Sequence, residues 1–116
     1  MNDIEIVHAI TEPTRYAILC LLLRHDYCVR ALARKLGISE PAVSQHMNVF
    51  KRYGLVEGRK LGYQVHYKVD RARIADALSH MSNALFADTS ERELTMACSC
   101  EFASECLRAH RPQGDR

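Results

Sequence analysis

Apolar residues recur at helical spacing in the N-terminal part of the chain and predict two helices. The first is short, and we expect its apolar face to meet a partner surface; that face is formed by Ile4, Val7, Ala9 and Ile10. Pro13 then marks a break and suits the first turn of the second helix, with Thr11 as the predicted cap. In residues 14–23 apolar side chains surround nearly the whole helix, which indicates a core helix buried on most sides.

The next two predicted helices are joined by a tight turn. Residues 28–36 repeat apolar positions at helical spacing, and Gly37 follows where a helix ends with a left-handed residue. Ser39 is a candidate N-cap and Pro41 suits an early helical position, after which helical spacing continues to Tyr53. Two short helices joined by a turn that contains Gly predict a helix-turn-helix, whose second helix enters the major groove of DNA.

A strand pattern follows, and then one more helix. Residues 55–60 and 63–69 predict the two strands of a hairpin around a Leu61-Gly62 turn, and the second strand has an alternating face formed by Tyr63, Val65, Tyr67 and Val69. A hairpin in this place is a wing. Asp70 is the predicted cap of the last helix, whose apolar stripe runs from Ile74 to Phe86. A helix this long at the edge of a small domain is expected to pair with its own copy.

The predicted fold is therefore mainly α with a small β-hairpin: a winged helix-turn-helix that forms a homodimer through its terminal helices. We assign residues 1–87 to the DNA-binding and dimerisation domain and residues 88–116 to a cysteine-containing tail, where the composition turns polar and acidic. The chain of 116 residues has room for one core, and its 47% hydrophobic content argues against wholesale disorder. No apolar run approaches the roughly 20 residues that span a bilayer, so we expect a soluble, cytoplasmic protein without membrane contacts.

Three motifs carry a resemblance to a known family. They are EPTRYAIL at residues 12–19, VRALA and LGIS at residues 29–33 and 36–39, and SQHM and GLV at residues 44–47 and 54–56. At these separations the chain resembles the ArsR/SmtB family of winged-helix repressors over about residues 4–87. Members of that family are cytoplasmic homodimers that leave operator DNA when they bind a metal or metalloid. The resemblance implies that double-stranded operator DNA and a second copy of the chain are the partners here.

The predicted recognition helix supplies most of the candidate DNA contacts. On or near its outer face it has Ser39, Glu40, Ala42, Val43, Ser44, Gln45, Asn48 and Lys51. Gln45 and Asn48 are residue types that pair with base edges, adenine above all, while Ser44 suits a base or a phosphate. His46 belongs to a family motif, which favours a packing role or one beside a phosphate over metal binding or catalysis. The alternative for each residue is an ordinary solvated surface side chain.

The charge is unevenly distributed along the chain. The net charge is +2, but residues 24–73 hold 11 Lys and Arg against 4 Asp and Glu. This stretch is suited to a polyanion, although a solvated basic surface has the same composition. On the predicted wing, Arg59, Lys60 and Gln64 are candidates for contacts to backbone phosphates or the minor groove.

Two ligand sites of the family are incomplete in this sequence. Some relatives open the first helix of the helix-turn-helix with Cys-Val-Cys, whereas Cys28-Val29-Arg30 keeps only the first cysteine. Other relatives bind zinc-type ions through two ligand pairs on the dimer helix. Here Asp76 and His80 are one turn apart and no second pair follows, which favours a plain solvated pair.

The remaining candidate ligands are Cys98, Cys100 and Cys106 in the tail. Three clustered thiolates suit a soft ion, and As(III) prefers pyramidal sulfur ligation. Some arsenic-sensing members of the family have cysteines in this region at similar spacing, so As(III) is the leading candidate inducer, followed by Sb(III), Cd(II) and Pb(II). Zinc with a fourth ligand such as His110, or an iron–sulfur cluster completed by Cys20, Cys28 or the other subunit, also fits. So does a thiol–disulfide switch between Cys98 and Cys106.

Together these features predict a metal- or metalloid-responsive repressor that leaves operator DNA when a thiophilic ligand binds the tail cysteines. The alternative is a winged-helix regulator in which the cysteines hold zinc or a cluster or act as a redox switch. A winged helix used for protein contacts is a further alternative. We do not expect an enzyme, because the sequence has no nucleotide-binding loop and no Cys-x-x-Cys motif.

Overall fold

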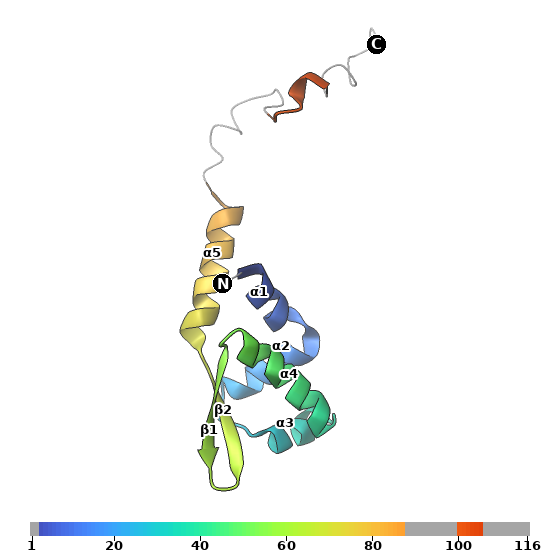
Figure 1. Ribbon diagram of the computed structural model, residues 1–116, viewed down its shortest axis with the longest axis vertical. Coiled ribbons are helices and arrows are strands. Elements are labelled where there is room, and N and C mark those ends of the chain that lie inside the picture. The colour runs from blue at the N-terminus through green and yellow to red at the C-terminus, as the bar shows by residue number, and fades with distance from the viewer. Residues whose placement is uncertain (1–2, 88–99, 106–116) are drawn as a thin grey trace. The chain divides into compact units, whose positions relative to one another are not determined.

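The computed structural model describes residues 3–87 and 100–105 of the chain. The chain divides into two units, residues 1–85 and 86–116. Within the described part of the first unit, five helices and one hairpin follow one another (Figure 1), with bounds α1 Asp3–Thr11, α2 Pro13–Leu22, α3 Val29–Leu36, α4 Glu40–Arg52, β1 Val56–Leu61, β2 Gln64–Val69 and α5 Arg71–Leu85. This order confirms the predicted fold class, a mainly α winged helix-turn-helix. Among the described residues, no helix is both long enough and apolar enough to span a bilayer.

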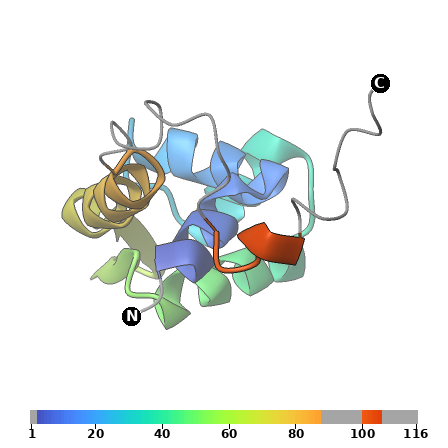
Figure 2. The ribbon, with the colours of Figure 1, turned by 90° about the horizontal axis from the view of Figure 1, so that it is seen from above.

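The core lies where α2, α3 and α4 meet the base of the hairpin. Its fully buried side chains include Ile18, Leu32, Val43, Phe50 and Leu55, each 0% exposed. Both views place α1 beside α5 (Figures 1 and 2), at the edge of this group of helices. Helix α3 and strand β1 pack against α4 and hold its apolar side on the core, while its polar side stays exposed.

Most helix ends follow the chemistry predicted from the sequence. Gly37 ends α3 in the left-handed conformation with φ +69°, and the Ser39 side chain accepts a hydrogen bond from the Ala42 N–H at 3.2 Å. The Asp70 carboxylate accepts from the Arg73 N–H at 3.0 Å and caps α5. A turn of three residues therefore separates α3 from α4, as a helix-turn-helix requires.

The predicted cap of α2 was wrong by one residue. Glu12 is the N-cap, since its two carboxylate oxygens accept from the N–H groups of Thr14 and Arg15, each at 3.0 Å. The Thr11 hydroxyl instead donates back into α1, to the carbonyl of Val7 at 2.9 Å. A carboxylate has two acceptor oxygens and satisfies two orphan N–H groups at once, which the threonine hydroxyl does not do here.

The hairpin turn also lies one residue later than predicted. Leu61 pairs with Gln64, so Gly62 and Tyr63 form the two-residue turn, with Gly62 at φ +65°. The predicted alternating face of the second strand is buried only where it meets the domain: Tyr67 and Val69 are 6% and 7% exposed, but Tyr63 is 101% exposed. The outer half of the wing therefore projects beyond the core, in reach of another molecule.

Candidate DNA-binding surface

The buried and exposed positions of α4 divide it into two faces. Val43, Met47 and Phe50 anchor the helix in the core, each at most 1% exposed. Ser44, Gln45 and Asn48 are exposed on the rest of the helix. Val43 was predicted among the outer-face residues, and that placement was wrong, because its side chain is fully covered by the core. The exposed polar side chains thus stand on a helix that is fixed from behind.

The first turn of α4 holds the other candidate contacts. Ser39 and Glu40 are exposed, and Ala42 is half-buried. Ser39 is also the N-cap of the helix, so its hydroxyl already accepts one backbone hydrogen bond. The helix N-terminus presents further N–H groups and the positive end of the helix dipole, both suited to a phosphate.

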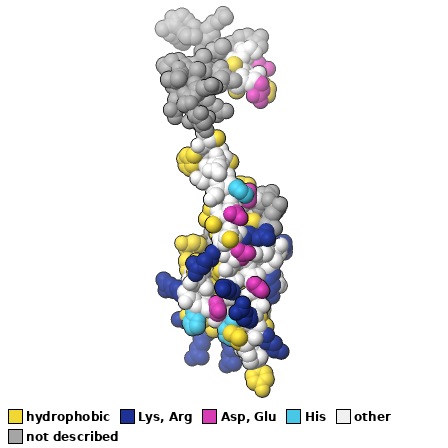
Figure 3. Space-filling view, turned by 90° about the vertical axis from the view of Figure 1, so that its left-hand side faces the viewer, with side chains coloured by type: hydrophobic (Ala, Val, Ile, Leu, Met, Phe, Trp, Pro, Cys, Tyr) yellow, Lys and Arg dark blue, Asp and Glu magenta, His cyan; other side chains and the backbone are white. Residues whose placement is uncertain are grey.

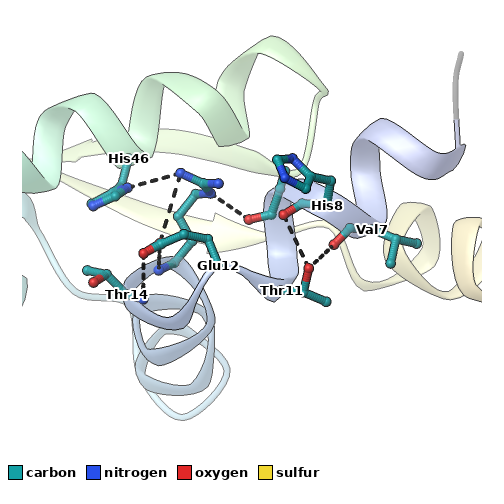
Figure 4. A network of polar contacts seen from close by, with 8 residues as sticks. Val7, His8, Thr11, Glu12, Thr14 and His46 are labelled. Atoms are coloured by element: carbon teal, nitrogen blue, oxygen red, sulfur yellow. Dashed lines mark hydrogen bonds and ion pairs between the residues drawn. The ribbon is translucent and has the colours of Figure 1, made fainter.

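His46 points toward α2 and not toward the open face of α4 (Figure 4). Its Nδ1 atom lies 3.3 Å from Nη1 of Arg15. Because a guanidinium has no acceptor, Arg15 donates this hydrogen bond and Nδ1 accepts it. The structure therefore gives His46 a polar contact within the protein, which fits the first of the two roles that the motif favoured, packing or a place beside a phosphate.

Glu12 completes the polar contacts around Arg15 (Figure 4). The hydrogen bond from the backbone N–H of Arg15, and next that from Thr14, hold the pKa of the Glu12 carboxyl below its ordinary value, because both bonds stabilise the charged form. The Arg15 guanidinium lies 4.0 Å from the same carboxylate. Sequence reasoning missed the role of Arg15, although the residue stands in one of the family motifs.

Lys51 links the recognition helix to the wing. Its Nζ atom lies 5.0 Å from the ring centroid of Tyr67, in a cation–π contact. Lys51 is exposed, as predicted, whereas the tyrosine is buried in β2. The ammonium group of the lysine already has a partner within the protein. Lys51 therefore connects α4 to β2 of the hairpin.

The wing and the start of α5 are rich in cationic side chains. Figure 3 shows Lys and Arg side chains gathered over the lower half of the face it displays. The exposed cations of these elements are Arg59, Lys60, Lys68 and Arg71. Gln64, the third predicted wing contact, is exposed as well. A positive surface beside an exposed polar helix is suited to a nucleic-acid backbone.

Of the three predicted metal ligands, Cys100 alone falls within the described residues. Cys98 and Cys106 lie outside the described residues, while Cys100 is exposed. In the part of the chain that the structure describes, no three His, Cys, Asp or Glu side chains gather to hold a metal ion. Cys28 is buried, and its sulfur accepts from the Ala31 N–H at 3.4 Å as the cap of α3. Cys20, on the predicted core helix, is partly buried.

The predicted pairing of His80 with Asp76 was wrong, because His80 contacts a different carboxylate. His80 Nδ1 on α5 lies 3.2 Å from the Oδ2 atom of Asp3, which begins α1. Both groups are substantially exposed, at 62% and 37% of their side-chain surfaces. This contact joins the two terminal helices, and such an exposed pair contributes little to stability.

Comparisons with known proteins agree with this architecture. Residues 12–58 match the model of the family described as bacterial regulatory protein, arsR family. The transcriptional repressor SdpR of Bacillus subtilis is 30% identical over 83 residues, which cover 72% of this chain and 90% of SdpR. The repressor SmtB of Mycobacterium tuberculosis is 34% identical over 80 residues, 66% of this chain, and the match spans only 59% of SmtB.

A solved structure supports the same assignment. The crystal structure of a possible transcriptional regulator for arsenical resistance superposes with a TM-score of 0.61 at 30% identity. The match covers 79% of this chain and 95% of that one. The relatives are named as regulators and repressors of transcription and not as enzymes. The resemblance seen in the sequence is thereby confirmed, and the chain belongs to the ArsR family of bacterial regulatory proteins, with their winged helix-turn-helix fold.

Proposed function

We propose that this protein binds double-stranded operator DNA as a homodimer and represses transcription. The observation that carries the proposal is the exposed polar face of α4, Ser44, Gln45 and Asn48, on a helix anchored by buried Val43 and Phe50. A helix presented in this way fits the major groove. Membership of a family of transcriptional regulators supports the same function.

The proposed contacts divide by chemistry. Gln45 and Asn48 read base edges, since a side-chain amide pairs with the donor and acceptor of adenine. Ser44 contacts a base or a phosphate, and Ser39 and Ala42 at the start of α4 lie against the DNA backbone. The Glu40 carboxylate only accepts hydrogen bonds, so it meets a base-edge donor such as the cytosine amino group and not a phosphate. On the wing, Arg59, Lys60 and Gln64 contact phosphates or the minor groove. Specificity then resides in α4, while much of the affinity is electrostatic and falls with salt.

We propose that α1 and α5 form the dimer interface. Each helix has large apolar side chains left uncovered in the single chain: Ile4 is 61% exposed, Leu78 44% and Leu85 68%. Ala77 is the buried residue of α5, so most of this helix is open to a partner. Burial of a contiguous apolar face is the usual driving force for association. A twofold dimer would place two copies of α4 on half-sites about one helical turn apart.

We further propose that a thiophilic ion bound by Cys98, Cys100 and Cys106 releases the DNA, with As(III) as the leading candidate. The support is the clustering of three thiols in the sequence and the relative named for arsenical resistance. If the ion binds better to a dimer with poorer spacing of its recognition helices, it lowers DNA affinity by the same free energy. Such coupling is typically about 1–3 kcal/mol.

DNA binding is tested with purified protein and a duplex selected from a random library. Fluorescence anisotropy is measured for the parent, for Gln45→Ala and Asn48→Ala, and for a control, Asp26→Ala, which changes an exposed side chain in the loop between α2 and α3. We expect each α4 variant to lose about 5- to 100-fold in affinity for the selected duplex, and the control to bind as the parent does. Selection of no sequence by the parent, or full affinity in both α4 variants, would refute the proposal.

Metal binding is tested by native mass spectrometry of the reduced chain with arsenite, cadmium, zinc or iron. A variant with serine at positions 98, 100 and 106 is compared with a control that has serine at positions 20 and 28. One As(III) per subunit in the parent and the control, and none in the tail variant, supports arsenic sensing. Zinc or a cluster in place of arsenic, or no metal at all, would overturn it in favour of another ion or a redox signal.

A further inference from the structure

The side chain of Arg15 hydrogen-bonds to two helices besides its own. It belongs to α2, and only 13% of its surface is exposed. Its Nε donates to the carbonyl of Ala9 in the last turn of α1 at 2.6 Å, and its Nη1 donates to Nδ1 of His46 in the middle of α4 at 3.3 Å. One planar cation thus joins the terminal helix to the recognition helix.

The contact with α1 has a local cause in the sequence. In an α-helix the carbonyl of Ala9 would accept from the N–H of residue 13, which is Pro13 and has no N–H. Ala9 is 2% exposed, so its carbonyl has little access to water and needs another donor. The Nε of Arg15 is that donor, which fixes the guanidinium in position beside α1. The rigid fork of the guanidinium then directs Nη1 at His46.

The contact with α4 adds a polar restraint to the rotation that the buried core side chains of this helix already set. His46 stands next to Gln45 and two residues before Asn48, and each residue advances an α-helix by about 100°. A restraint on His46 is therefore also a restraint on the rotation of the backbone from which Gln45 and Asn48 project. Pairing of an amide with a base edge needs two hydrogen bonds at once, so a small rotation of the helix weakens both.

We propose that Arg15 is a positioning residue for DNA recognition: through His46 it holds α4 at the rotation that lets Gln45 and Asn48 meet base edges together. The proposal rests on the function proposed above, because it assumes that α4 reads DNA. Arg15 itself touches no base. Its effect is on the discrimination between sequences, whereas a phosphate-binding residue affects all sequences alike.

The test compares two duplexes, one selected from a random library and one of the same composition in scrambled order. The full-length variants are Arg15→Met, which keeps the aliphatic length without donors, His46→Leu, which removes the acceptor, and His46→Asn, whose amide oxygen can accept in place of Nδ1. The double variant Arg15→Met/His46→Leu completes the cycle. Thermal midpoint and dimer mass are recorded for each protein.

We expect Arg15→Met and His46→Leu each to lower affinity for the selected duplex about tenfold, which is roughly the loss of one base-pair contact. Affinity for the scrambled duplex should fall less than about twofold. The double variant should lose no more than either single change, because both remove the same hydrogen bond. His46→Asn should restore affinity to within about twofold of the parent. If Arg15→Met does not fold, the contrast between the two His46 variants decides the matter.

Equal losses of affinity on both duplexes would overturn the inference and assign His46 to a phosphate contact. The salt dependence of binding by His46→Leu would then correspond to about one phosphate contact fewer than in the parent. Parent-like selectivity in His46→Leu would overturn it as well. Failure of the underlying function is distinguishable, because the parent would then show no preference between the duplexes, whatever the variants do.

Discussion

Replacement of Gly37 by alanine isolates the energetic cost of the turn between α3 and α4. Gly37 has φ +69° and ψ 31°, and no atom lies within 4 Å of the position that a Cβ would take. The substitution therefore creates no clash, and its cost arises from the backbone alone. An L-residue in this conformation costs about 1–2 kcal/mol, while reduced freedom of the unfolded chain offsets about 0.4–1 kcal/mol. The net destabilisation is about 1 kcal/mol, or about 4–8 °C in the melting temperature of a domain of this size.

The assay is thermal unfolding followed by circular dichroism, with all proteins at one concentration because dimerisation would shift the midpoint. Gly37→Asn is the matched control: it adds a larger side chain than alanine but tolerates the left-handed conformation better. We expect the midpoint to fall in the order glycine, asparagine, alanine. An alanine variant as stable as the parent, or an asparagine variant less stable than alanine, would refute the argument that conformation and not space governs this site.

Three further predictions concern the hairpin and the start of α2. Gly58→Ala places a Cβ 2.9 Å from Val65 Cγ1 and 3.2 Å from Tyr67 Cε1. We expect this overpacking to lower the free energy of unfolding, measured with urea, by about 1–3 kcal/mol, and an unchanged urea midpoint would contradict it. Lys51→Met removes the cation–π contact and should lower the free energy of unfolding by about 0.5–1 kcal/mol in the same assay. In a Tyr67→Leu background, where the ring is absent, the same change should have no effect. The lowered pKa of Glu12 means that its contribution to stability is complete above its ordinary pKa and is lost as pH falls through the lowered value. Glu12→Gln should therefore melt lower at neutral pH and converge with the parent in acid, and a constant difference at every pH would exclude this linkage.

Features that depend on neighbours in sequence were predictable here, whereas contacts between distant residues were not. Gly37, Ser39 and Asp70 were identified because caps and left-handed turns follow from the chemistry of one or two residues. The prediction of Thr11 as the cap failed because the neighbouring Glu12 side chain can accept at a helix start as well. Only the three-dimensional course of the chain shows which one reaches the N–H groups.

The candidate site divides in the same way. Spacing on α4 contained the signal that Val43 is buried, since Val43, Met47 and Phe50 recur every three or four residues as a core stripe does. The contact between Arg15 and His46 joins residues 31 positions apart, and no local pattern in a single sequence indicates it. The assignments of bases and of the inducing ion stay predictions, because specificity depends on the geometry of a complex.

The packing of α1 on α5 has a consequence for the synthesis of this protein. The contact between Asp3 and His80 joins residues 77 positions apart, and Ile6 on α1 is 2% exposed in the finished domain. At roughly 5–20 residues per second, a ribosome needs about 4–15 s to make the chain between them. During that interval part of the apolar face of α1 has no α5 to cover it and is open to chaperones. The domain closes only after α5 has left the ribosome, so a chain that stops before α5 leaves uncovered the side of α1 that α5 would bury.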